Sequence, residues 1–244
     1  MELGDMTVRL TVVDRGHVLA GVVREGESWW EAAQRTAGSL SGVPSPIDLS
    51  GEVKMFAIDH DWSVTVRAMT RGDLPLVTRW RQRPHVHQWW TDDGEPTLER
   101  VTEQYAADID GTTPTRMWVA EVNGRSVGFV QDYRVGDYPD YALLTPDADA
   151  VGIDYAIGEP EWTGRGLGTR ILWAWLLKAR HRFPGTARCF AAPDHRNEAS
   201  LRVLEKSGFV RGLWFDEPRR DGGVDTVVGC TLDLDRVLGA AGGT

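Results

Sequence analysis

The chain has 244 residues, 41% of them hydrophobic and 26% charged, which is typical of a globular protein with one large domain or one domain and an appendage. The formal net charge of -9 argues against general nucleic-acid binding, which needs a basic face, and is compatible with a small cationic partner. No apolar run reaches the roughly 18 residues of a membrane span, and no signal peptide is apparent, so we expect a cytoplasmic protein without a membrane partner.

Residues 1–62 are expected to form a small α+β unit of their own. Three segments alternate as strands do: 7–13, 17–23 and 53–58. Residues 27–40 place apolar side chains at helical spacing. The segment from Gly26 to Arg35 faintly resembles a Nudix box, but residues 36–41 contain no carboxylate to hold Mg²⁺. We therefore assign this unit no hydrolase chemistry, and leave open whether it caps the main domain or forms a homodimer.

Residues 63–244 have the pattern of an α+β domain with a mixed sheet flanked by helices. Strands are predicted at 64–68, 117–122, 126–133, 151–157, 187–192, 209–215 and 226–232. Helices are predicted at 70–80, at 95–109, from residue 167 through 181, and at 197–207. Residues 136–149 are predicted to be a loop. Cys189 and Cys230 lie in apolar runs and are expected to be buried free thiols, and the histidines show no metal-ligand spacing.

The strongest chemical signal is the turn Gly164-Arg165-Gly166-Leu167-Gly168-Thr169 between a strand and a long apolar helix. Glycine lets the backbone approach a ligand, and a helix N-terminus offers unpaired N–H groups and a positive dipole end. The turn is therefore expected to bind a phosphate or pyrophosphate. It lacks the Gly-Lys-Ser/Thr of a Walker A loop, and its glycine spacing is not that of a nicotinamide-binding unit.

This turn and a second motif resemble those of the GNAT superfamily of acetyltransferases. The motifs are residues 160–168 and 197–209, and the resemblance covers roughly residues 64–234. It implies a mostly antiparallel sheet, acetyl-CoA as cosubstrate and no metal. The residues that it assigns to acetyl-CoA are Tyr155, Ala156, Ile157, Thr163, Gly164, Arg165, Gly166, Leu167, Gly168, Thr169, Asn197 and Arg202. For Asn197, capping of its own helix is an equal alternative.

Within the superfamily, the sequence is most similar to aminoglycoside 6′-N-acetyltransferases. The likeness rests on residues 85–90, 104–105, 128–133, 152–160 and 166–170. Siderophore lysine acyltransferases and kasugamycin-type acetyltransferases are related, so the substrate stays open. The chain departs from the usual pattern at Thr163, Ala192 and Leu204. Leu204 stands where the family has a tyrosine proposed to protonate the leaving thiolate, but a thiolate can leave unaided because a thiol has a pKa near 8.5.

The resemblance implies that Asp154 is the catalytic base, on a strand that would run beside the thioester. The predicted substrate-binding residues are Trp89, Trp90, Gln131, Asp132, Asp137, Asp140, Asp194 and Asp221. Three functions remain open: acetylation of an aminoglycoside in antibiotic resistance, acylation of another amine such as a siderophore hydroxylysine, and acyl-CoA binding without catalysis.

Overall fold

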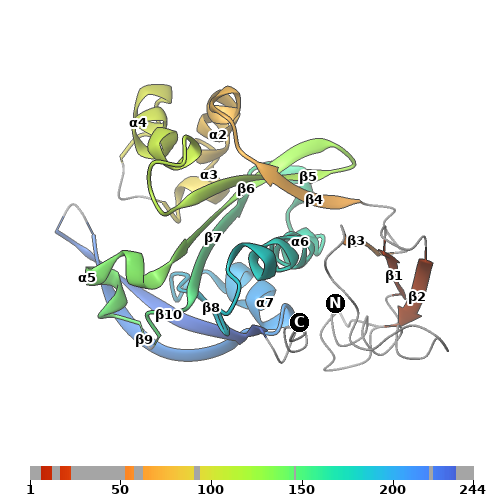
Figure 1. Ribbon diagram of the computed structural model, residues 1–244. Helices are drawn as coiled ribbons and strands as arrows, with labels where there is room; N and C mark the ends of the chain where they lie inside the picture. Colours follow the sequence, from red (N-terminus) through yellow and green to blue (C-terminus); the bar gives the residue numbers. More distant parts are fainter. Residues whose placement is uncertain are drawn as a thin grey trace.

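The computed structural model describes residues 7–12, 17–22, 53–57, 63–90, 94–145, 147–219 and 222–234. Its largest feature is a seven-stranded sheet with the order β4-β5-β6-β7-β8-β10-β9 (Figure 1). The strands are β4 (Val64–Ala68), β5 (Arg116–Val122), β6 (Arg125–Arg134), β7 (Val151–Ile157), β8 (Arg188–Ala191), β9 (Val210–Pro218) and β10 (Val224–Asp233). Neighbouring strands are antiparallel except β7 and β8, which are parallel. The predicted mixed, mostly antiparallel sheet flanked by helices is thus confirmed.

Helices cover both faces of this sheet, with α2, α3 and α4 on one side and α6 and α7 on the other (Figure 1). The helices are η1 (Arg71–Asp73), α2 (Leu74–Arg81), α3 (Pro84–His87), α4 (Leu98–Ile109), η2 (Val135–Asp137), α5 (Pro139–Ala142), η3 (Pro160–Trp162), α6 (Leu167–Arg182) and α7 (Glu198–Lys206). Trp80 and Tyr105 pack with Phe129 of β6 on the first face. On the second face, Trp175 and Leu204 belong to a larger buried cluster. Two apolar layers therefore hold the sheet from both sides.

A separate three-stranded antiparallel sheet has the order β2-β1-β3. It consists of β1 (Thr7–Val12), β2 (His17–Val22) and β3 (Val53–Ala57). The three strands predicted in the first 62 residues are therefore present. The helix predicted at 27–40 lies outside the described residues, and the division of the chain at residue 62 stays a prediction.

The helices differ from the sequence-based expectation mainly at their ends and in one loop. The helix expected from residue 70 begins as η1, where Thr70 and Asp73 form a capping box, and continues as α2. Helix α4 begins at Leu98 because the Thr97 hydroxyl accepts a hydrogen bond from the Arg100 amide at 3.3 Å. The loop predicted at 136–149 contains η2 and α5.

Two short α-helices, α3 and α5, were not predicted, and neither were the 3₁₀ helices η2 and η3. The two α-helices have a common feature. Each is four residues long and has proline in its first turn, at Pro84 and Pro139. Proline fixes φ at a helical value there and its missing N–H is not needed, but four residues are too few for a periodic pattern.

Two further expectations can be compared with the structure. Cys189 and Cys230 are both buried free thiols, as predicted. No helix in the part of the chain that the structure describes is long and apolar enough to cross a membrane.

Candidate active site

The sheet opens where its two parallel strands diverge. Strand β8 pairs with β7 only at Val151 and Gly152, whereas β6 pairs with every residue of β7. No other described strand pairs with this edge of β7 from Ile153 to Ile157. Backbone groups on that edge are available to a ligand, except that the His85 ring contacts the Ile157 carbonyl oxygen through Nε2 at 2.9 Å.

The glycine-rich turn lies next to this opening and leads into α6. Gly164 and Gly166 have φ of 69° and 78°, a left-handed conformation that favours glycine. A Cβ atom added to either one would meet no heavy atom within 4 Å, so the turn has open space beside it. The first turn of α6 contains no acidic residue. Its free N–H groups and dipole end therefore suit an anion such as a pyrophosphate.

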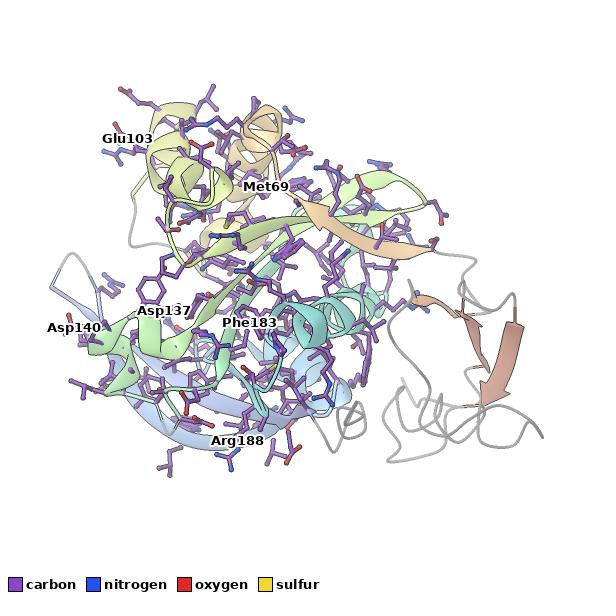
Figure 2. All side chains as sticks on the ribbon, in the orientation of Figure 1. Met69, Glu103, Asp137, Asp140, Phe183 and Arg188 are labelled. Carbon is purple, nitrogen blue, oxygen red and sulfur yellow. The ribbon has the colours of Figure 1, made fainter. Side chains whose placement is uncertain are left out.

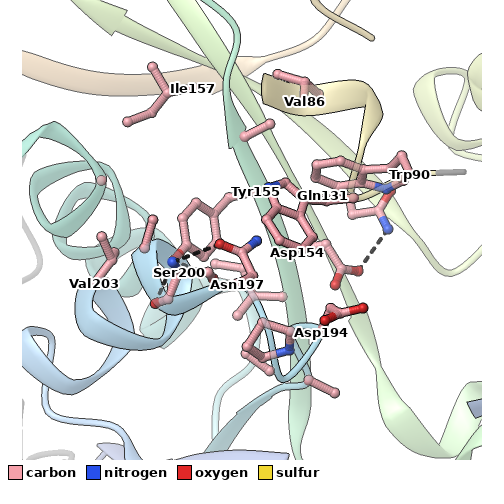
Figure 3. Close-up of a pocket in the computed structure, with 18 of the residues that line it drawn as sticks. Val86, Trp90, Gln131, Asp154, Tyr155, Ile157, Asp194, Asn197, Ser200 and Val203 are labelled. Atoms are coloured by element: carbon pink, nitrogen blue, oxygen red, sulfur yellow. Dashed lines mark hydrogen bonds between the residues drawn. The ribbon is translucent and has the colours of Figure 1, made fainter. Parts of the chain in front are cut away.

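A cleft of about 1380 Å³ joins the turn, the open edge of β7 and helices α3 and α7 (Figure 3). The residues predicted to bind acetyl-CoA line this cleft, with Arg165 as the exception. Arg165 is exposed, and its guanidinium lies over the Trp162 ring at 5.4 Å. The Arg165 side chain therefore does not line the cleft, although it was predicted to bind acetyl-CoA.

Asp154 lines the cleft from the middle of β7. The Gln131 amide donates a hydrogen bond to its Oδ2 at 2.8 Å, because the two residues are paired across β6 and β7 (Figure 3). The Tyr133 hydroxyl is a second hydrogen-bond partner. Burial raises the pKa of the Asp154 carboxyl, and the two hydrogen bonds oppose the rise. Neutral donors therefore hold the carboxylate in place, and its pKa is shifted toward neutral pH, where a general base works best.

Aromatic side chains that the sequence did not single out surround Asp154. Tyr133 makes edge contacts with Tyr138 and Tyr141, at ring separations of 5.4 and 6.2 Å. Its ring lies directly over Gly152, where a Cβ atom would stand 2.4 Å from the ring. All three tyrosines line the cleft, and Tyr141 comes from α5. Tyr138 and Tyr141 lie in the predicted loop at 136–149, whose helical turns were not predicted, whereas Tyr133 lies on β6.

Asp132 does not line the cleft, and this contradicts the predicted contact with substrate. Its carboxylate is buried and accepts hydrogen bonds from the indole N–H groups of Trp118 at 2.6 Å and Trp175 at 2.9 Å. It also forms an ion pair with Arg182 at 3.0 Å. Burial raises the pKa of Asp132, and these donors oppose the rise. Neighbours on a strand face opposite sides, so Asp132 points into the core while Gln131 faces Asp154.

The other predicted aspartates fall into three groups. Asp137 and Asp140 are exposed and lie outside the cleft lining, with Asp140 at the periphery of the molecule (Figure 2). Asp194 lines the cleft, but its carboxylate pairs with Arg196 at 2.6 Å, and hydrogen bonds from Arg196 lower its pKa. Asp221 lies outside the described residues.

Two tryptophans were predicted to bind substrate. Trp89 and Trp90 both line the cleft, and Trp90 also packs on Phe129 with ring centroids 5.5 Å apart. Three carboxylates that sequence reasoning missed line the cleft as well: Asp108, Glu217 and Asp225. They come from α4, β9 and β10, which are far apart in the sequence. The acceptor end of the cleft is therefore aromatic and rich in carboxylates.

The second motif contributes the cofactor side of the cleft. The Asn197 Oδ1 accepts a hydrogen bond from the Ser200 amide at 3.1 Å, so Asn197 caps α7 as one alternative predicted. The cap uses only the Oδ1 atom of Asn197, and the residue lines the cleft, so its side-chain N–H groups can donate to a ligand there. Leu204 is fully buried in the core, whereas Val203 lines the cleft.

A mixed sheet whose one parallel pair diverges beside a glycine-rich turn agrees with the resemblance to the GNAT acetyltransferases. The model of the acetyltransferase (GNAT) domain family matches residues 70–216. The chain belongs to this family, and it is an acetyl-CoA-dependent N-acetyltransferase.

Individual relatives agree with this assignment. The chain is similar to the aminoglycoside N(6′)-acetyltransferase type 1 of Klebsiella pneumoniae, with 31% identity over 61% of this chain and 75% of that protein. It is also similar to a lysine N-acyltransferase of Mycobacterium sp. (strain MCS), with 27% identity over 56% of this chain and 55% of that protein. Among solved structures, AAC(6′)-Ib in complex with paromomycin and acetyl-CoA has a TM-score of 0.62 and 27% identity, over 74% of this chain and 98% of that one.

Proposed function

We propose that the chain transfers the acetyl group of acetyl-CoA to a primary amine of an aminoglycoside-type molecule, with Asp154 as the base. One observation carries this proposal. A carboxylate of raised pKa lies on the strand whose open edge adjoins the phosphate-binding turn. An acyl donor anchored at the turn and laid along β7 would bring its thioester near that carboxylate.

The described residues fit acetyl-CoA. The N–H groups at the start of α6 would hold the pyrophosphate, and the open space beside Gly164 and Gly166 admits it. The free edge of β7 would pair with the amides of the pantetheine arm, and Asn197 would donate from its amide nitrogen. When bound, acetyl-CoA supplies an acetyl group on a good leaving group.

Asp154 would remove the proton that prevents the amine from attacking. An alkylamine is mostly protonated at neutral pH, so a group in the site has to accept one proton from it. General bases work best with a pKa near the operating pH, and burial moves Asp154 in that direction. Gln131 and Tyr133 would keep its oxygens aimed at the amine, and the proton would afterwards pass to water.

The acceptor end suits a polycation with sugar rings. Asp108, Glu217 and Asp225 add negative charge to the same cleft as Asp154. Cations are attracted to such a site, and tryptophan and tyrosine faces pack against sugar rings and ammonium groups. The solved complexes of relatives with paromomycin and ribostamycin support this substrate class. Acetylation would remove a positive charge from the antibiotic, which is the basis for a proposed role in resistance.

The second candidate is acylation of a lysine-type amine in a siderophore. The likeness to lysine N-acyltransferases at 23–27% identity supports it. The charge of the cleft does not separate the two candidates, because Asp194 and Asp225 already pair with Arg196 and Arg219. The higher identity to the aminoglycoside acetyltransferases, over a larger share of their length, favours the first candidate.

A thiol-release assay separates the possibilities. We would measure CoA release from acetyl-CoA with kanamycin-type amines, with lysine and hydroxylysine, and with no acceptor, using Asp154→Asn as the matched variant. Turnover of the aminoglycosides that is lost in Asp154→Asn agrees with the proposal. Turnover of lysine derivatives alone would favour the second candidate. Binding of acetyl-CoA with no turnover on any amine would mean a non-catalytic acyl-CoA-binding protein.

A further inference from the structure

Tyr155 follows Asp154 directly on β7, and the two side chains point to opposite sides of the strand. Figure 3 shows the Tyr155 ring on the α7 side, with the Asp154 carboxylate on the other. This is the period-two alternation of a strand. Both residues line the cleft. One strand therefore carries a carboxylate toward the acceptor end and a phenol toward the end where the acyl donor would lie.

The Tyr155 hydroxyl is held at α7 by Ser200. Its oxygen lies 3.0 Å from the Ser200 hydroxyl oxygen. Asn197 fixes Ser200 in turn, through the cap on its backbone amide. The phenol itself donates to the Ser200 carbonyl oxygen, but at 3.4 Å this hydrogen bond is long and weak, and rotation of the hydroxyl would redirect the proton to a better acceptor in the cleft. Burial also raises the pKa of Tyr155, which keeps the phenol protonated at neutral pH.

The reaction needs a donor on this side. When the acetyl carbon forms its bond to nitrogen, the carbon–sulfur bond breaks and the sulfur keeps the electron pair. A thiolate of pKa near 8.5 can leave without being protonated, but a hydrogen bond in a dry cleft stabilises the charge as it develops. Leu204 lies one helical turn after Ser200 on α7, but it is buried in the core and its side chain has no polar hydrogen to donate.

We propose that Tyr155 is a catalytic residue, whose hydroxyl donates a hydrogen bond to the sulfur of the departing coenzyme. Ser200 acts as a positioning residue that fixes the orientation of the phenol. This inference rests on the proposed function, because it requires CoA to lie in the cleft. The amine proton goes to Asp154 and then to water, and the thiolate leaves with its electron pair and is protonated by solvent.

The thiol of bound CoA tests the role of Tyr155 without turnover. Its ionisation is followed by the ultraviolet absorbance of the thiolate in the binary complex, and the complex with desulfo-CoA supplies the baseline that contains the tyrosine signal. We expect the thiol pKa of bound CoA to be about one unit higher in Tyr155→Phe than in the wild type, a tenfold change in the ionisation constant. Ser200→Ala retains the phenol but loses the hydroxyl that orients it, so the thiol pKa should lie between those of the wild type and Tyr155→Phe.

Kinetics give the second readout. Tyr155→Phe is expected to lower kcat by about tenfold to a hundredfold, the range for a hydrogen bond to a charged group, with little change in the KM for acetyl-CoA. Phenylalanine keeps the ring, and thermal unfolding checks that the fold is unchanged. Equal thiol pKa values in the wild type and in Tyr155→Phe, with CoA bound to both, overturn the role of Tyr155 alone. Failure of the wild type to bind CoA overturns the proposed function, and this inference with it.

Discussion

Removal of the Asp132 carboxylate is predicted to destabilise the protein and to leave substrate binding largely intact. In the structure this carboxylate accepts from the indoles of Trp118 and Trp175 and pairs with Arg182, and the residue is 0% exposed. Asp132→Ala would leave two indole N–H groups and one guanidinium without their acceptor. The side chain of Arg182 is 27% exposed, so water can reach part of its charge and limit the cost.

The size of the effect follows from these contacts. Breaking a buried ion pair by removing one partner costs about 3–5 kcal/mol, and partial access of water to Arg182 places the expectation near the lower end. A domain of this size loses about 2–4 °C in Tm for each kcal/mol, so the Tm should fall by roughly 6–12 °C for the lower figure. Asp132→Asn keeps an acceptor oxygen and loses the charge, and it should fall between Asp132→Ala and the wild type.

Urea and thermal unfolding measure the loss of stability, and steady-state kinetics below both transitions measure the KM for the amine. A change in stability under about 1 kcal/mol, which is the size typical of surface substitutions, would refute the reasoning. So would a large rise in the amine KM with unchanged stability, since that result is expected of a substrate-binding carboxylate.

Three further predictions follow from the site and its surroundings. Asp154→Asn should lower kcat by about a hundredfold to ten thousandfold, because a general base contributes a factor of that size, while acetyl-CoA still binds in calorimetry. In the wild type, kcat should fall as the pH drops through the raised pKa of Asp154, since only the ionised form accepts a proton. Gly166→Ala should weaken acetyl-CoA binding in the same calorimetric assay. A residue with a Cβ atom at φ of 78° costs about 1–2 kcal/mol, and relief of this strain shifts the N–H groups of the turn. Equal affinity of the variant and the wild type would contradict this. The hydrogen bond from Arg67 lowers the pKa of Asp73 to about 2, from the 3.8 of a free aspartate. The contribution of Asp73 to stability is therefore present above pH 3.8 and is lost as the pH falls toward 2. Asp73→Asn should flatten this acid limb of the unfolding free energy, and an unaltered limb would count against the pair.

The sequence predicted the fold class, most of the strands and helices, and the glycine-rich turn beside the cleft. Strand alternation predicted the strands, and the glycines at 164 and 166 adopt the left-handed φ expected of such a turn. Such features are local, since each depends on residues close together in the chain.

The acceptor half could not be predicted in the same way. Asp132 and Gln131 are neighbours in the sequence, yet one is in the core and the other contacts Asp154, and only the register of β6 with β7 decides which. Glu217 and Asp225 are paired across β9 and β10, and β10 in turn pairs with β8, so the order of the sheet brings both residues to the cleft. Long-range pairings of this kind leave no mark in the local pattern.

The most direct test of the central claim is a crystal structure of the protein with CoA and kanamycin together. The account predicts the pyrophosphate on the turn of Gly164 and Gly166, and an amine nitrogen within about 2.6–3.2 Å of an Asp154 carboxylate oxygen or joined to it by one water. A complex with the coenzyme away from that turn, or with every amine of the antibiotic beyond the reach of Asp154, would contradict it.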